Sequence, residues 1–129
     1  MKKLFFFLSF LISIYSFSQK LEKIPLRKYK IATLSDSLRE TSGLTFFKDK
    51  LYTFNDGGNP NLVFEIDKNS GKILNKLQTN FPNKDWEAIT NDGENLYIGD
   101  FGNNAGNRND LAIYKIENST NSSKILFNY

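Results

Sequence analysis

Residues 42–52, SGLTFFKDKLY, and residues 87–97, EAITNDGENLY, are two copies of one pattern that begin 45 residues apart. Each copy has a run rich in aromatic, leucine or β-branched residues, then a polar turn, then a second run that starts with Leu-Tyr. Short runs of this kind, bounded by turn formers, are typical of antiparallel strands joined as a hairpin. The sequence therefore predicts the same hairpin twice.

The repeat extends toward the C-terminus in both copies. Residues 63–66 match residues 113–116 at an offset of 50, and residues 72–74 match residues 124–126 at an offset of 52. The offset grows only between the matched runs, and length changes confined to loops are typical of a structural repeat. Each copy thus predicts four strands, at about 42–47, 51–55, 62–67 and 73–78 in the first and 87–90, 96–100, 111–117 and 125–129 in the second.

Four-stranded repeats of this length predict an all-β fold, namely a β-propeller of which the chain contains two antiparallel blades. A β-sandwich is the alternative, because it also has short strands at regular spacing. No stretch outside the apolar N-terminus shows a sustained helical period, so we expect essentially no helix. Since two blades cannot close a ring, we expect an N-terminal fragment of a larger propeller of about six to eight blades, or a piece that identical copies complete.

The N-terminus predicts export. Lys2-Lys3 precedes an apolar run at residues 4–15, and residues 16–18 offer small side chains for cleavage before Gln19. The run is shorter than the about 20 residues of a membrane span. We therefore expect a secreted, periplasmic or cell-surface protein without a transmembrane segment after cleavage. Its expected parts are a signal peptide at 1–18, cleaved after Ser18, a lead-in arm at 19–39, and propeller blades at 40–129, with repeats at about 40–82 and 83–129.

Composition excludes several kinds of site. The chain has no cysteine and no histidine, so it cannot form a disulfide, a thiolate or imidazole zinc site, or a Ser-His-Asp triad within itself. Basic residues gather in residues 20–30, whereas the chain that follows is slightly acidic. This distribution argues against nucleic acid as a partner.

Strand direction sorts the loops onto two sides of the predicted blades. In an up-and-down blade, the connection between the second and third strands and the link to the next blade lie on one rim. That rim receives the segments with most of the carboxylates and amides, at 39–41, 55–59, 83–87 and 100–110. The opposite side receives ordinary polar turns. The first rim is therefore the candidate functional face.

The oxygen-rich rim favours a hard cation. Carboxylates, carboxamides and carbonyls in glycine-containing loops suit Ca²⁺, which takes about six to eight oxygen ligands. The alternative is that these side chains cap turns through bonds to the backbone. The candidate metal ligands are Asp85, Glu87, Asp100, Asn103, Asn104 and Asp110.

A second group of rim residues could bind an extracellular ligand: Glu40, Asn55, Asp56, Asn59, Trp86 and Arg108. The Trp86 ring could stack on a sugar or another ring, or could instead pack between blades. The Arg108 guanidinium could hold a phosphate or carboxylate, or could instead pair with Asp110 or Asp100. The pairs Asp85/Glu87 and Asp56/Asp100 also admit acid–base chemistry.

These motifs resemble a family of secreted bacterial β-propellers of the Bacteroidetes type. The resemblance covers about Glu40 to Tyr129 and rests mainly on residues 85–89, DWEAI, and 99–104, GDFGNN, with support from 40–44, 55–59 and 108–114. It implies an exported propeller larger than this chain, distantly similar to phytase-like, gluconolactonase-like and NHL-type propellers. Because a shared fold does not carry function, the resemblance assigns no catalytic residue.

The sequence thus predicts a secreted propeller module that binds Ca²⁺, or an extracellular small molecule, glycan or protein, through its rim. One alternative is a Ca²⁺-dependent hydrolase of phosphoesters, lactones or glycans, in which Asp85, Glu87 and Asp100 serve as metal ligands or general bases. The other is a non-functional gene fragment.

Overall fold

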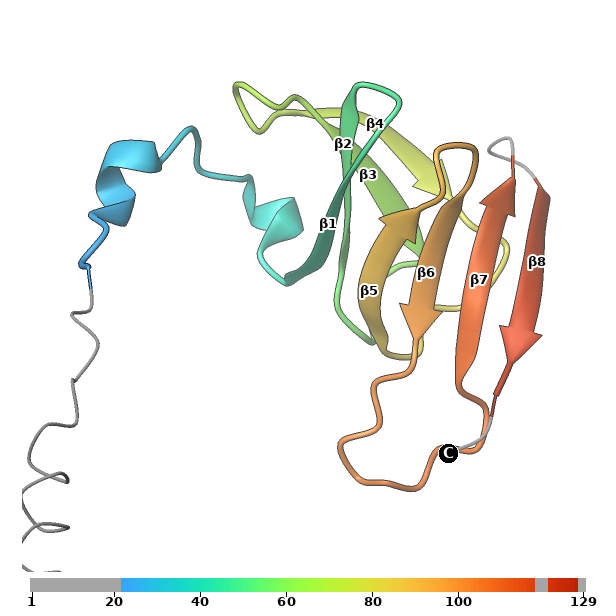
Figure 1. Cartoon of the computed structure of the whole chain (residues 1–129). Coiled ribbons are helices and arrows are strands. Elements are labelled where there is room, and N and C mark those ends of the chain that lie inside the picture. Colours follow the sequence, from blue (N-terminus) through green and yellow to red (C-terminus); the bar gives the residue numbers. More distant parts are fainter. Residues whose placement is uncertain (1–21, 118–120, 128–129) are drawn as a thin grey trace, which may run out of the picture.

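The structure, a computed structural model, describes residues 22–117 and 121–127. In these residues the chain forms two four-stranded antiparallel sheets, each with its strands in sequence order (Figure 1). An all-β fold made of two copies of one four-stranded unit is thereby confirmed. The strands are β1 (Thr41–Phe47), β2 (Lys50–Asn55), β3 (Leu62–Ile66), β4 (Ile73–Gln78), β5 (Trp86–Asn91), β6 (Leu96–Asp100), β7 (Ala112–Glu117) and β8 (Asn121–Leu126).

The first seven strands agree with their predicted bounds to within one residue at each end. The eighth differs, because β8 begins at Asn121 rather than at 125 and ends at Leu126. Its polar first half pairs with the end of β7, from Glu117↔Asn121 onward. Strand β8 lies at the edge of its sheet, where ladder bonds form without apolar side chains.

Helix in the described part of the chain is limited to two 3₁₀ turns, η1 (Leu26–Tyr29) and η2 (Asp36–Leu38), both ahead of β1. No helix in this part is both long and apolar enough to cross a membrane. The predicted signal peptide at 1–18 lies outside the described residues.

The two sheets share an irregularity at equivalent positions. The register shifts between Thr41 and Gly43 where β1 pairs with β2, and between Trp86 and Ala88 where β5 pairs with β6. A bulge at the same place in both sheets is a shared backbone feature, and similar amino-acid composition alone would not produce it. It supports the offset of 45 residues between the two units.

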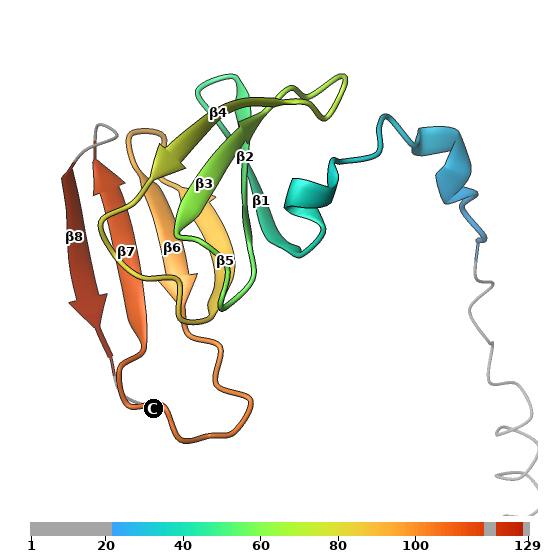
Figure 2. The same ribbon diagram turned by 180° about the vertical axis from the view of Figure 1, so that it is seen from behind.

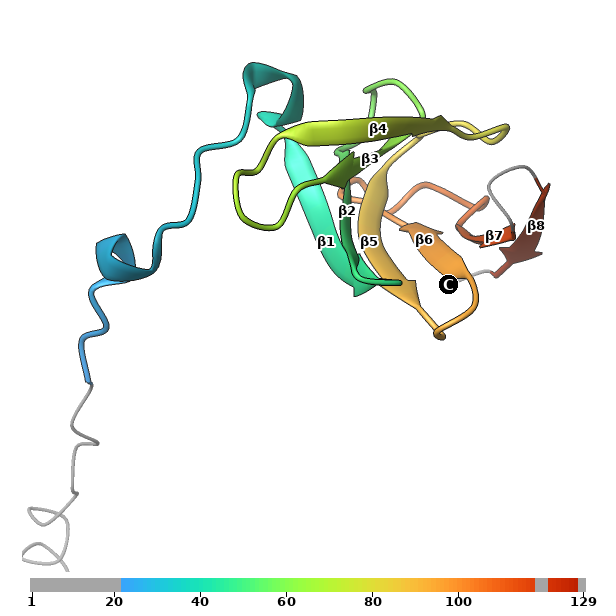
Figure 3. The same ribbon diagram turned by 90° about the horizontal axis from the view of Figure 1, so that it is seen from above.

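The two sheets pack face to face, with β1 and β5 side by side (Figure 3). Trp86 is the centre of the shared core, because its ring lies 5.4 Å from that of Phe54 and 5.6 Å from that of Phe81. Phe81 also stacks on Tyr114, with ring centroids 3.9 Å apart. Asn91 donates hydrogen bonds to Thr45 Oγ1 and the Phe46 carbonyl, which ties the two sheets together at the far end.

The lead-in arm covers part of the other face of the first sheet. Leu38 of η2 is buried, and with Leu34 it packs against Phe64 and Ile66 of β3. The arm thus supplies apolar cover to a sheet face that would otherwise meet water.

Three connections meet at one end of the sheets, as strand direction predicts (Figure 2). They are the β2–β3 connection (56–61), the β4–β5 connection (79–85) and the β6–β7 connection (101–111). Asn83 Nδ2 donates to the carbonyls of Asn55 and Asp56, at 2.9 Å each, and the Gly102 amide donates to the Asp85 carbonyl at 3.1 Å. We call this end the rim.

Candidate functional site

Three carboxylates from two segments of the rim lie close together. Asp56 follows β2, Asp85 precedes β5, and Glu87 lies at the bulge of β5. One oxygen of each side chain lies within 4.8 Å of one oxygen of each of the others. Opposed oxygens around a Ca²⁺ ion are separated by about 5 Å, because each Ca–O distance is about 2.4 Å. The group could therefore hold a metal ion, and we call it the open acidic cluster.

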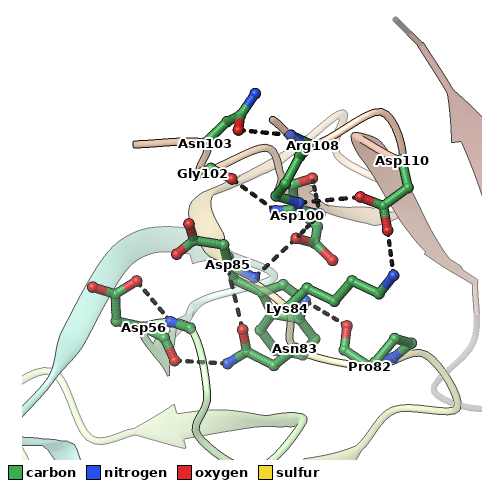
Figure 4. Close-up of polar contacts among 12 residues, drawn as sticks. Asp56, Pro82, Asn83, Lys84, Asp85, Asp100, Gly102, Asn103, Arg108 and Asp110 are labelled. Atoms are coloured by element: carbon green, nitrogen blue, oxygen red, sulfur yellow. Dashed lines mark hydrogen bonds and ion pairs between the residues drawn. The ribbon is translucent and has the colours of Figure 1, made fainter. Parts of the chain in front are cut away.

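Two glycines leave the space that the Asp85 carboxylate occupies. A Cβ on Gly57 would lie 2.6 Å from Asp85 Oδ1, and one on Gly102 would lie 2.2 Å from Asp85 Oδ2. Only glycine lets both loop backbones approach the side chain this closely. Figure 4 shows Asp85 between Asp56 and Gly102. This role of the two glycines was not predicted from the sequence, although they are separated by the same 45 residues as the repeat.

No positive charge offsets the open acidic cluster within the described residues. Asp56 Oδ1 accepts a hydrogen bond from the Gly57 amide at 2.7 Å, while neither Asp85 nor Glu87 forms an ion pair there. Burial raises the pKa of the Glu87 carboxyl, and the negative charges of Asp56 and Asp85 raise it further. Like charges held this close favour either a proton or a bound cation.

A neighbouring set of charged side chains is balanced instead (Figure 4). Arg108 Nη2 lies 2.9 Å from Asp100 Oδ1, and Arg108 Nε lies 3.1 Å from Asp110 Oδ1. Lys84 Nζ pairs with the other oxygen of Asp110. We call these four residues the closed cluster. Arg108 thus pairs with Asp100 and Asp110, which is the alternative to ligand binding that the sequence offered.

The closed cluster is built into the fold. Asp100 is 0% exposed, and its Oδ1 also accepts a hydrogen bond from the Asp85 amide at 3.0 Å. Burial alone would lower the pKa of Arg108, but hydrogen bonds to Asp110 and Asp100 outweigh it and raise the pKa. Hydrogen bonds from Lys84 and then Arg108 lower the pKa of Asp110. Two of the predicted metal ligands therefore already have cationic partners.

The two candidate asparagines lie in the long β6–β7 loop. Asn103 Oδ1 accepts hydrogen bonds from the backbone amides of Asn107 and Arg108, at 3.0 Å and 2.9 Å, which is the turn-capping alternative. Asn104 is exposed in the same loop. Of the predicted metal ligands, Asp85 and Glu87 thus belong to the group that could hold a metal ion, which also includes Asp56 from the predicted ligand-binding group.

The other predicted ligand-binding residues lie around the first sheet and the core. Glu40 Oε2 accepts a hydrogen bond from Asn59 Nδ2 at 2.7 Å, next to the open acidic cluster. Asn55 is buried at the end of β2. Trp86 is 0% exposed, as its packing alternative expects, so its ring offers no surface on which a ligand could stack.

Comparisons of this chain with protein-family models, with curated proteins and with solved structures gave no match.

Proposed function

We propose that this chain is an exported β-propeller module that binds Ca²⁺ at its rim through Asp56, Asp85 and Glu87. The observation that carries the proposal is the meeting of three carboxylates, from two segments far apart in the sequence, without a compensating cation among the described residues. The closed cluster strengthens this argument, because on the same rim Asp100 and Asp110 are neutralised by Arg108 and Lys84.

The assignment of the two sheets as propeller blades is supported by their shared strand order, shared bulge and face-to-face packing. In a propeller, each blade packs one face on the blade before it and the other on the blade after it. The first sheet has an apolar outer face, where Leu44 and Phe46 are exposed. The second sheet exposes Ile125, and Phe101 is exposed in the connection after β6. Export is proposed from the N-terminal sequence alone.

Calcium suits the open acidic cluster better than softer metals. Its donors are carboxylate oxygens, and the chain has no histidine or cysteine to favour zinc or copper. Three carboxylates supply up to six oxygens, and water completes the coordination. Burial raises the pKa of Glu87 most, and a bound cation would offset the further rise that the charges of Asp56 and Asp85 cause.

The test is thermal unfolding of the exported chain, without its leader, in Ca²⁺ and in EGTA. We expect Ca²⁺ to raise Tm, because a ligand that binds only the folded state stabilises it. Asp85→Asn and Glu87→Gln should each abolish the rise. Asp110→Asn is the matched control, since it removes a carboxylate of the closed cluster and should leave the rise intact.

Two outcomes would overturn the proposal. One is an unchanged Tm of the unmodified chain at millimolar Ca²⁺. The other is a Tm rise that survives in both Asp85→Asn and Glu87→Gln, which would place the cation elsewhere.

A further inference from the structure

The first sheet has an apolar outer face that the lead-in arm covers only in part. The arm packs on β3, whereas Leu44 and Phe46 of β1 are 61% and 53% exposed. A groove of about 510 Å³ lies between the arm and this part of the sheet. Its lining is mostly apolar and includes Tyr29, Ile31, Leu34, Leu44, Leu51 and Ile66. Apolar surface gathered in this way is typical of an interaction site.

The repeat indicates what kind of partner fits this face. Thr41 and Leu44, which line the groove, are equivalent to Trp86 and Ile89, 45 residues further on. Both equivalents are buried, at 0% and 8% exposed, because they pack against the first sheet. The ring of Phe54, for example, lies 5.4 Å from that of Trp86. In the second repeat, the partner of this face is thus another four-stranded sheet.

The second sheet presents a matching surface on its own outer face. Ala88, Gly99 and Ile125 lie in one row across that face, joined through the register of β5 to β8. It is the equivalent of the first-sheet face that packs on β5. Gly99 takes the place of Phe54, and the ring of Phe101 lies over Gly99. Ala88 and Ile125 are exposed, so this face also lacks a cover within the described residues.

We propose that the second sheet of one copy packs into the groove on the first sheet of a second copy, repeating the contact that joins the two sheets within the chain. Leu44 of one copy would then lie against Ala88 and Phe101 of the next. Within the chain, the equivalent Ile89 lies beside Gly43, the equivalent of Ala88. Because the two faces differ, the contact is heterologous and repeats until a ring closes. A ring of about six to eight blades holds three or four copies.

The arm is compatible with this contact. Within the described part of the chain, residues 22–33 form hydrogen bonds only among themselves and lead away from the sheets, so they can move aside (Figure 1). Leu38 can stay on Phe64. In the second repeat, Phe81 packs in the same way on Tyr114, the equivalent of Phe64, beneath the covering sheet. The contact does not rest on the cation site.

The test is size-exclusion chromatography with light scattering on the exported chain, without its leader, from micromolar to near-millimolar concentration. EGTA is present throughout, so the proposed cation site makes no contribution. We expect the mass of three or four chains at high concentration. Leu44→Asp disables one face and Ile125→Asp the other, so each variant alone should be a monomer. An equal mixture of the two should form a dimer, because each variant retains the face that the other has lost.

Leu126→Asp is the matched control. Leu126 is 63% exposed against 55% for Ile125, and it points to the opposite side of β8, so this variant should assemble like the unchanged chain. Far-UV circular dichroism checks that each variant folds. If Leu44→Asp does not fold, Phe46→Lys decides, because Phe46 is exposed on the same face.

Three outcomes would overturn the proposal. One is a monomer at every concentration of the unchanged chain. The second is assembly that persists in either single-face variant alone. The third is a mixture of the two variants that stays monomeric although the unchanged chain assembles, because that result would indicate contact between like faces.

Discussion

The rim contains two groups of carboxylates that differ in what surrounds them. In the closed cluster, Asp100 and Asp110 lie against Arg108 and Lys84. In the open acidic cluster, Asp56, Asp85 and Glu87 meet with no cation among the described residues. The backbone of Asp85 bridges the two groups, because its amide bonds to Asp100 while its side chain belongs to the open cluster. The closed cluster has the properties of a structural support, and the open one those of a binding site.

The largest effect is expected from breaking the closed cluster at its buried member. Arg108→Ala leaves the Asp100 carboxylate buried without its cation, which costs about 3–5 kcal/mol of unfolding free energy. Urea unfolding followed by tryptophan fluorescence measures the loss. Lys84→Ala is the control, because Lys84 is exposed and should matter far less. Equal losses in the two variants would contradict the distinction between a buried and an exposed pair.

An intermediate effect is expected where a loop backbone presses on the open cluster. Gly102→Ala should cost about 1–3 kcal/mol, because its Cβ would lie 2.2 Å from Asp85 Oδ2. Asp85→Ala removes the obstructing carboxylate, so the double variant should lose at least about 0.5 kcal/mol less than the sum of the single variants. Strict additivity of the three unfolding free energies would show that Gly102 and Asp85 do not interact.

The smallest expected effect is a difference between the two clusters in how the stability of their variants depends on pH. The pKa of Glu87 is raised above its ordinary 4.5, so its favourable contribution exists below that pH and is lost as pH rises through the raised pKa. In EGTA at neutral pH, Glu87→Gln should therefore stabilise, by less than about 1 kcal/mol. The gain should vanish in acid, as followed by Tm against pH.

Asp110→Asn provides the opposite sign in the same experiment. The pKa of Asp110 is lowered below its ordinary 3.8, so its contribution is present above that pH and is lost as pH falls through the lowered pKa. Asp110→Asn should thus destabilise at neutral pH, with a difference that shrinks in acid. The same sign for both variants at neutral pH would show that the clusters do not differ in charge balance.

Sequence reasoning predicted the strands and the rim because both follow from short-range patterns. Alternating apolar residues and turn formers locate β1 to β7, and strand direction alone brings Trp86 and Asn103 to one end of their sheet. It did not predict which carboxylates meet. Asp100 shares a face with Ile98, since both alternate inward along β6, and that parity could have marked it as buried. Asp56 lies just beyond the end of β2, where no alternation applies.

The pairing of Arg108 with Asp100 or Asp110 was one of two interpretations of the sequence, which could not decide between it and ligand binding. It depends on the path of the 101–111 loop, whose conformation is set by the Asn103 cap and by Arg108 Nη1 donating to the Gly102 carbonyl at 2.8 Å. Loop geometry of this kind follows from contacts in three dimensions rather than from periodicity. The polar start of β8 could not be predicted from the sequence either, because these residues become a strand by pairing with β7.

The lead-in arm has a practical consequence for anyone who trims this protein. A version starting at Thr41 would lose Leu34 and Leu38 and uncover Phe64 and Ile66 of β3, side chains that are nearly sealed from water when the arm is present. Exposed apolar sheet faces promote aggregation. The cooperative unit therefore begins ahead of the first strand, and expression boundaries should be drawn upstream of Leu34 rather than at the start of the repeat.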